Sequence, residues 1–215
     1  MELQTLTSRP VGSWGGYVVL ANSVKHGQCC VAGKRLDTKE WVRPVSNADG
    51  AELTSQQASA MNPYGAFKVK PLQKVNMCFE QAVPLKNQPE NHLINGVQWV
   101  QQYNITPDEL NQFLDTPTSL WGCGDRMDYQ SIMVGQAAVE QSLQLVKVEH
   151  LMLYVDGNDK RRASFSYNDI QYDLAVTDPS FDNLVSQQSD LRGILCISLG
   201  EEFHGDCYKL VAAIY

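Results

Sequence analysis

The amino-acid sequence predicts a mainly β protein, all-β with a few short helices, whose strands form a sandwich or small barrels. Three observations favour this fold class. Apolar and polar residues alternate with a period of two along most apolar segments, whereas the helical period of 3.6 is sparse. Turn-forming residues also separate these segments at short and regular spacing, which is typical of sandwiches and barrels.

The first half of the chain shows this alternation most clearly in four segments: 17–27, 28–36, 40–46 and 74–80. In the last of these, Val75, Met77 and Phe79 share one face, and the residues between them take the other. Pro44 has no N–H to donate, so its strand should lie at a sheet edge or end there.

The second half continues the pattern. Residues 145–155 read as a strand, and residues 161–178 read as a hairpin whose tight turn is Asn168-Asp169. Segments 193–200 and 207–215 look like a further antiparallel pair around an acidic tip.

One helix is expected, over 106–115, because Thr106 can cap it and Pro107 suits its first position. Shorter candidates lie at 54–61 and 179–188. The helix and the irregular sequence after it divide the chain into two β-rich parts. The predicted organisation is therefore a first barrel, a helical and irregular connector, and a second barrel, at 1–105, 106–140 and 141–215.

Composition narrows the class of protein. The 215 residues are 43% hydrophobic, which suits a folded chain, and the apolar runs are far shorter than a membrane helix of roughly 20 residues. Six cysteines occur without a CxxC pair, so we expect a reduced, cytoplasmic protein with mostly buried thiols. The net charge of −7 argues against non-specific coating of nucleic acid, although a local basic patch can still bind it.

The segment 23–46 concentrates basic residues next to a tryptophan. If 40–45 is extended, Trp41 and Arg43 share one face, and an indole and a guanidinium placed so can stack on a base. Two other interpretations stay open. Trp41 can fill the core while Arg43 makes an ion pair, and the surrounding Lys and Arg side chains can simply be solvated.

Four blocks of the sequence resemble the bacterial dual OB-containing domain family, in order and over nearly the whole chain. They are "LANSVKHGQCCVAGKRL...EWVRPVS", "TPTSLWGCGDRM", "RASFSYNDIQYDLAVTDP" and "CISLGEEFHGDCYKLVAAI". One departure is Glu202, where the family pattern favours a proline. The resemblance implies two OB-like β-barrels in one chain.

The resemblance also implies binding of single-stranded nucleic acid or a nucleotide without catalysis, and it suggests a role in a bacterial defence or mobile-element system. OB barrels bind oligomers with stacking aromatics and a basic groove. The matching positions are Lys25, Arg35, Trp41 and Arg43 in the first block, followed by Arg126, Arg161, Arg162 and Lys209. No cofactor, no metal and no membrane partner is expected.

Two other functions stay open. The chain can be a protein-interaction adaptor that pairs through exposed β-edges. It can also be a hydrolase, because Cys123 and Asp125 lie in a glycine-rich turn and residues 201–206 hold carboxylates beside a histidine. Each of these two motifs is more simply a structural turn.

Overall fold

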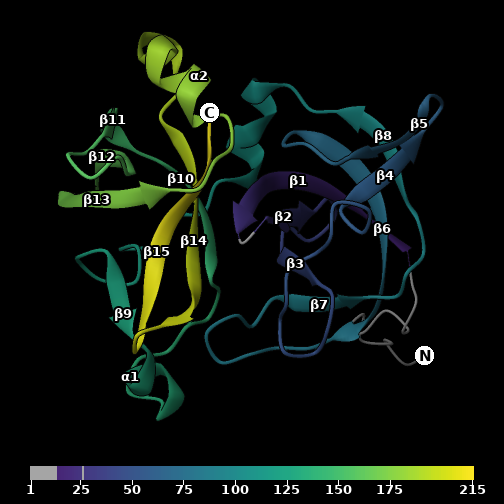
Figure 1. The fold of residues 1–215 in the computed structure, drawn as a ribbon, viewed down its shortest axis with the longest axis horizontal. Coiled ribbons are helices and arrows are strands. Elements are labelled where there is room, and N and C mark those ends of the chain that lie inside the picture. Colours follow the sequence, from purple (N-terminus) through teal and green to yellow (C-terminus); the bar gives the residue numbers. More distant parts are fainter. Residues whose placement is uncertain (1–13, 26) are drawn as a thin grey trace, which may run out of the picture.

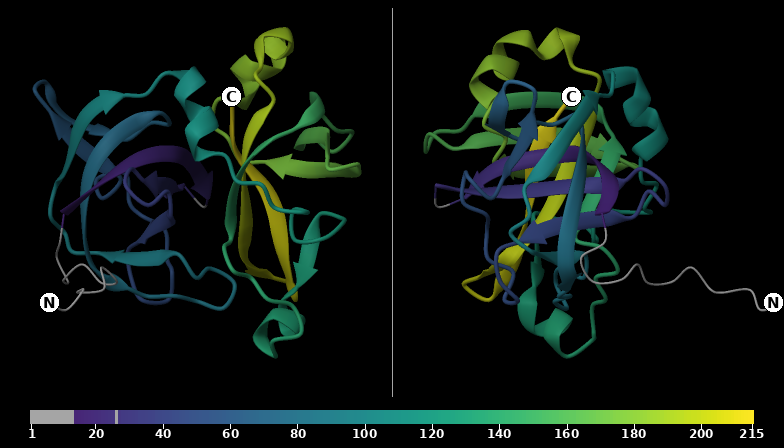
Figure 2. Two further views of the ribbon diagram at one scale, coloured as in Figure 1. Left: turned by 180° about the vertical axis from the view of Figure 1, so that it is seen from behind. Right: turned by 90° about the vertical axis from the view of Figure 1, so that its right-hand side faces the viewer.

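The computed structural model describes residues 14–25 and 27–215, and of Lys25 and residues 188–190 it describes the backbone alone. About 52% of the described residues are strand and 10% are helix, which confirms the mainly β prediction. The strands form one eight-stranded and one seven-stranded sheet, and each sheet curls into a barrel. The two barrels stand next to each other in Figures 1 and 2.

The first barrel is closed by five strands: β1 (Trp14–Lys25), β2 (Gln28–Arg35), β3 (Trp41–Val45), β6 (Gln73–Ala82) and β7 (Asn91–Ile94). β1 pairs with both β2 and β6, and β3 runs parallel to β7, so the ring order is β1-β2-β3-β7-β6. This is the five-stranded Greek-key arrangement of an OB-fold. Pro44 lies one residue before the end of β3, but β3 is not an edge strand, because β2 and β7 flank it.

Three further strands extend the first barrel: β4 (Ser59–Asn62), β5 (Gly65–Lys68) and β8 (Trp99–Asn104). The helix predicted over 54–61 is wrong. Thr54 and Gln57 bond each other's backbone N–H groups through their side chains and form a turn. Ala58 and Ala60 then alternate into the barrel core, which is a strand period and not a helical one.

The second barrel repeats the same order. Its strands are β10 (Leu143–Lys147), β11 (Glu149–Val155), β12 (Arg161–Tyr167), β13 (Ile170–Val176), β14 (Ile194–Phe203) and β15 (Asp206–Ile214). β13 runs parallel to β15, and β10 and β11 follow each other as one strand that pairs first with β14 and then with β12. The single strand expected over 145–155 is thus interrupted near Glu149, and the ring is β10/β11-β12-β13-β15-β14.

The hairpin predicted over 161–178 is confirmed. Asn168 and Asp169 have φ values of 48° and 62°, the left-handed pair that a two-residue hairpin turn requires. The pairing predicted for segments 193–200 and 207–215 is also confirmed, as β14 and β15.

The connector begins with a 3-10 helix, η1 (Pro107–Phe113), where an α-helix was expected over 106–115. The carboxylate of Glu109 accepts the backbone N–H of Thr106, and Leu110 and Phe113 are buried. A short strand β9 (Arg126–Asp128) and a helix α1 (Tyr129–Met133) follow, and α2 (Phe181–Leu184) with η2 (Val185–Asp190) occupies the segment predicted as helical at 179–188. The exact domain boundaries stay a prediction.

Each barrel has its own apolar core, and a third cluster lies between the barrels. In this inter-barrel interface, Val18, Leu20 and Trp41 of the first barrel pack against Leu145 and Cys196 of the second. Burial of apolar surface therefore holds the barrels together, at roughly 25 cal/mol for each Å² removed from water. Cys29, Cys78, Cys196 and Cys207 are buried, as expected, whereas Cys123 is exposed.

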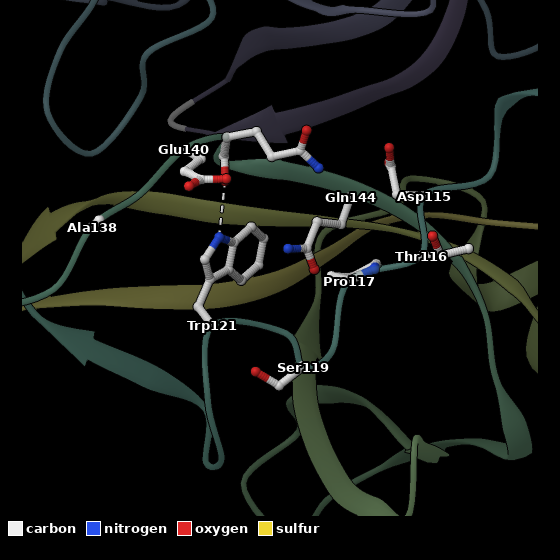
Figure 3. A pocket seen from close by; sticks show the side chains of 9 residues that line it. Asp115, Thr116, Pro117, Ser119, Trp121, Ala138, Glu140 and Gln144 are labelled. Atoms are coloured by element: carbon white, nitrogen blue, oxygen red, sulfur yellow. Dashed lines mark hydrogen bonds between the residues drawn. The ribbon is translucent and has the colours of Figure 1, made fainter.

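One cavity of about 390 Å³ opens beside this interface, lined by residues of two connector segments and by Gln144 of β10 (Figure 3). In the part of the chain that the structure describes, no helix is long and apolar enough to span a bilayer.

Candidate nucleic-acid interface

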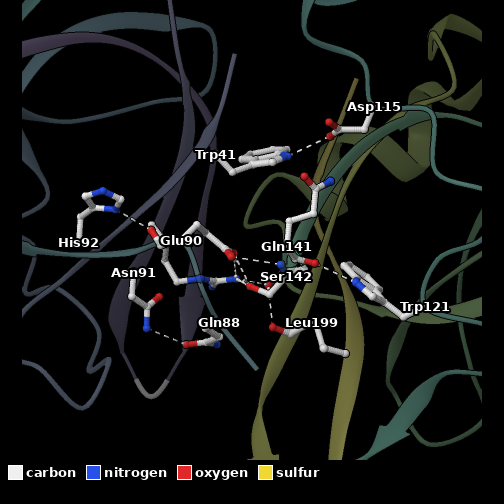
Figure 4. A network of polar contacts seen from close by, with 12 residues as sticks. Trp41, Gln88, Glu90, Asn91, His92, Asp115, Trp121, Gln141, Ser142 and Leu199 are labelled. Carbon is white, nitrogen blue, oxygen red and sulfur yellow. Dashed lines mark hydrogen bonds and ion pairs between the residues drawn. The ribbon is translucent and has the colours of Figure 1, made fainter. Parts of the chain in front are cut away.

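The outer face of β2 and β3 in the first barrel carries the aromatic and basic residues predicted to bind a ligand. Trp41 and Arg43 do share this face, and Val42 between them points into the barrel core. Trp41 is only 6% exposed, however. Its indole Nε1 donates to Oδ2 of Asp115 at 2.9 Å, so the ring is fixed against the connector (Figure 4).

Lys34 of β2 shares the same partner. Its Nζ lies 2.5 Å from Oδ1 of Asp115 and donates to the carbonyl of Phe113 at 2.7 Å. Burial lowers the pKa of Lys34, and the Asp115 carboxylate opposes that shift. The second oxygen of Asp115 also accepts the backbone N–H of Leu145 in the second barrel. One carboxylate therefore connects both barrels.

Arg43 makes a second polar connection across the interface, and Figure 4 shows two of its partners, Glu90 and Ser142. Its Nη2 donates to Ser142 Oγ at 2.8 Å and to Ser198 Oγ at 3.2 Å, and it lies 3.5 Å from Oε1 of Glu90. Glu90 in turn accepts the hydroxyl and the backbone N–H of Ser142. The Arg43 and Glu90 side chains are 11% and 5% exposed, so this is a buried, hydrogen-bonded ion pair.

These contacts show what covers the first barrel. OB-folds bind oligomers mainly across the face of their second and third strands. Here the second barrel covers that face, and Trp41 and Arg43 hold it in place. Little of either side chain is left for a ligand, and their assignment to a binding surface stays a prediction.

The other first-block residues lie at the margin of this face. Arg35 is half-buried, pairs with Asp37 at 3.1 Å, and packs over the ring of Tyr17. Lys25 ends β1, and its side chain lies outside the described part of the chain.

The corresponding face of the second barrel is open to solvent. Its residues point away from the barrel core. Met152, Ser164 and Asp173 form one row across β11, β12 and β13, and Tyr154 and Arg162 form a second row across β11 and β12. Gln171 lies beside these rows on β13. We call these six residues the open face. Figure 1 shows β11, β12 and β13 on the side of the molecule remote from the first barrel.

Hydrogen bonds order the centre of the open face. Arg162 donates to Asp173 through Nε at 3.0 Å, and the hydroxyl of Tyr154 donates to the same carboxylate at 2.5 Å. Arg162 keeps a side-chain exposure of 22%. An aromatic ring and a guanidinium are therefore presented together in fixed positions on an accessible sheet.

A cluster of aromatic and charged residues continues from the open face along β9 and the β14–β15 hairpin. The guanidinium of Arg126 lies 4.5 Å from the ring centre of Tyr208, and that ring lies 6.3 Å from Phe203, which is 61% exposed. Arg126 also pairs with Asp125, and together with the more distant Arg162 it lowers the pKa of that carboxyl. We call Arg126, Phe203 and Tyr208 the rim.

The sequence analysis named Arg126 and Arg162 as candidate binding residues but missed the aromatic residues that lie beside them. The signal was present in the alternation of residues 149–155, because Leu153 in the core puts Met152 and Tyr154 on the outer face. Phe203 and Tyr208 lie in the predicted final hairpin, where alternation alone does not show which face stays open.

Arg161 and Lys209 both interact with other residues of the protein. Arg161 pairs with Asp182 at 2.6 Å and packs over Phe181 of α2. Lys209 is 1% exposed, and its Nζ donates to the carbonyls of Gly122, Cys123 and Gly124 at 2.9 to 3.1 Å. Burial lowers the pKa of Lys209 to about 8. Lys209 thus fixes the glycine-rich turn from inside and does not reach solvent.

The residues considered for catalysis lie on two turns of the second half of the chain. Cys123 is exposed on the turn that Lys209 holds, and Glu202 accepts the N–H of Gly205 at 2.7 Å and closes the hairpin tip. Among residues 14–25 and 27–215, no group of three or more His, Cys, Asp and Glu side chains could hold a metal ion. The 201–206 segment is the tip of the β14–β15 hairpin, with its turn at His204 and Gly205.

Two barrels of the same strand order and an accessible strand face define a double OB-fold protein. The pattern of the dual OB-containing domain family matches residues 17–214, nearly the whole chain, and the protein belongs to that family. No curated protein matches it significantly. A solved structure, the tetrameric p202 HIN2, matches over 95% of this chain and 92% of its own at 9% identity, with a TM-score of 0.29. A likeness this weak carries no argument.

Replacing Arg43 with alanine should destabilise the protein by about 3 kcal/mol, because it leaves the Glu90 carboxylate buried without its cation. Urea denaturation measures the free energy of unfolding. Arg126→Ala is the matched control, since its ion pairs are exposed and worth at most about 1 kcal/mol. Equal losses in the two variants would show that the Arg43 network does not hold the barrels together.

Lys209 predicts a pH dependence of stability. Its pKa is about 8 in the folded protein and near 10.5 in the unfolded chain, so the unfolded chain holds more protons between these values. The free energy of unfolding therefore gains a contribution on the order of 2 kcal/mol as pH rises through this window, and loses it as pH falls. Urea titrations below, within and above the window should show this rise in the wild type and not in Lys209→Met. Parallel pH profiles for the two proteins would contradict the assignment.

Proposed function

We propose that the protein binds single-stranded nucleic acid or a nucleotide through the open face and rim of its second barrel, without catalysing a reaction. One observation carries this proposal. The two barrels share the OB strand order, but the ligand face is covered in the first barrel and exposed in the second. An OB protein that binds an oligomer needs such a face.

The chemistry of this surface suits a strand of nucleotides. Tyr154, Tyr208 and Phe203 offer rings on which bases can stack, and Arg126 and Arg162 offer cations for phosphates. Asp173, Asp125 and Asp206 pair with these cations and keep the surface from being strongly basic. Binding should therefore be modest and should weaken with salt. A role in a bacterial defence or mobile-element system stays a prediction.

One observation favours a second function, that of an adaptor. Among the described residues, β5 (Gly65–Lys68) is the last strand of the first sheet and pairs on one side only. Phe67 on this strand and Tyr64 in the turn before it are 52% and 89% exposed. An exposed edge with aromatic side chains can add a strand from a partner protein. This function predicts no affinity for nucleic acid at the open face.

Fluorescence anisotropy with short labelled single-stranded DNA and RNA, at low and physiological salt, tests the main proposal. Wild-type protein should bind saturably. Arg162→Ala and Arg126→Ala should each weaken binding roughly three- to tenfold. Each should also make the slope of log affinity against log salt shallower by about one, the value for one lost phosphate contact.

Arg192→Ala is the matched control, because Arg192 is as exposed as Arg126 but pairs with Asp108 of the connector. It should leave the affinity unchanged. Absence of binding at low salt would overturn the proposal in favour of the adaptor. Binding that survives both Arg126→Ala and Arg162→Ala would place the nucleic acid on another surface.

A further inference from the structure

The β4–β5 hairpin leaves one edge of the eight-stranded sheet open. Among the described residues, β5 pairs with β4 and with no other strand. Figure 1 shows the hairpin projecting from the first barrel on the side remote from the second barrel, and the left view of Figure 2 shows the same from behind. The free edge of β5 is therefore accessible to another chain.

The backbone of β5 specifies what this edge binds. The N–H of Val69 donates to the carbonyl of Ala58 at 2.9 Å, at the end of the ladder between the two strands. Backbone groups alternate in direction along an antiparallel strand, so Ala66 and Lys68 direct their N–H and C=O groups away from β4, to the free edge. A row of donors and acceptors of this kind is completed by another extended strand.

The charges of the hairpin limit how a second copy of it can pair with this edge. The whole chain has a net charge of −7, but no Asp or Glu occurs from residue 54 to residue 79. The charged residue of β5 is Lys68, which stands at its end. Lysine on an edge strand discourages pairing. The register of two copies must therefore keep the two Lys68 side chains apart.

We propose that the β5 edge binds a second copy of this chain, with the two β5 strands antiparallel and the twofold axis at Ala66. In this register Ala66 lies opposite its own counterpart, and the two residues exchange two backbone hydrogen bonds. Lys68 lies opposite the counterpart of Tyr64, whose ring can hold the ammonium group by a cation–π contact. An axis at Lys68 would instead bring two ammonium groups together, and an axis at Phe67 would place each of them beside the methyl group of an alanine.

The other face of the strand favours the same register. The ring of Phe67 lies over Gly65 of its own strand, 3.6 Å from the position that a Cβ would take there. The axis at Ala66 brings the counterpart of Phe67 opposite Gly65, so the two rings become diagonal neighbours above bare glycines. Aromatic residues cover glycines of edge strands in this way. Both faces of the strand thus gain an aromatic contact in one register.

This interface joins two strands of four residues each. It is therefore smaller than the roughly 1,600 Å² that stable complexes bury, and the dimer should be weak. The inference names the partner of the edge that favours the adaptor function, and it does not depend on nucleic-acid binding.

Sedimentation equilibrium of the full chain, from micromolar to millimolar concentration, tests the proposal. The wild type should show a reversible equilibrium between monomer and dimer. Ala66→Pro removes the N–H that points to the second copy and leaves the bonds to β4 in place, so the dissociation constant should rise at least about tenfold. Ala66→Ser keeps this N–H and is the matched control, which should dimerise like the wild type. A wild type that stays monomeric at millimolar concentration would overturn the proposal.

Cysteine cross-linking tests the register, in a Cys123→Ser background because Cys123 is exposed. Ala66→Cys puts two thiols on residues whose Cα atoms lie about 5.5 Å apart, within reach of a disulfide, so mild oxidation should give a covalent dimer. Lys68→Cys is the matched control on the same strand, because its counterpart lies roughly 13 Å further along the ladder. Equal cross-linking of the two variants would contradict the axis at Ala66.

This second measurement decides if Ala66→Pro does not fold. Arg162→Ala should leave the dimer intact, because Arg162 lies on the open face of the second barrel. Failure of dimerisation and failure of nucleic-acid binding are therefore distinguishable.

Discussion

Two carboxylates, the partly buried one of Asp115 and the buried one of Glu90, determine how the two barrels face each other. Asp115 accepts from Lys34, from the indole of Trp41 and from the backbone of Leu145, and so joins first barrel, connector and second barrel. Glu90 pairs with Arg43 and with Ser142 in the same way. Buried charges need partners with fixed geometry, so these contacts specify one docking of the barrels among the many that apolar packing alone would allow.

This docking gives two barrels of the same topology different surfaces. In the first, the outer face of β1, β2 and β3 is an interface with apolar residues and buried ion pairs. In the second, the face of β11, β12 and β13 carries Met152, Tyr154 and Arg162 at the surface. Fold alone does not assign function. We place the binding hypothesis on the second barrel because the corresponding face of the first barrel is covered.

Much of the fold could be predicted from the sequence, because strand alternation and turn residues are local signals. The shared face of Trp41 and Arg43 was predicted correctly, and so was the alternative in which Trp41 is buried and Arg43 makes an ion pair. Their partners could not be predicted, since Asp115 lies 74 residues from Trp41, and Ser198 lies 155 residues from Arg43. No pattern within a strand shows which of its faces another barrel will cover.

Lys209 shows a second limit of the sequence. Its ammonium group binds three backbone carbonyls, of residues 122–124, and backbone partners leave no trace in a side-chain pattern. Trp121, which lines the cavity, comes immediately before these residues. Asp125 and the rim residue Arg126, which form an ion pair, come immediately after them. One buried cation therefore fixes the short turn that leads from Trp121 to Arg126, although the two residues face different parts of the surface.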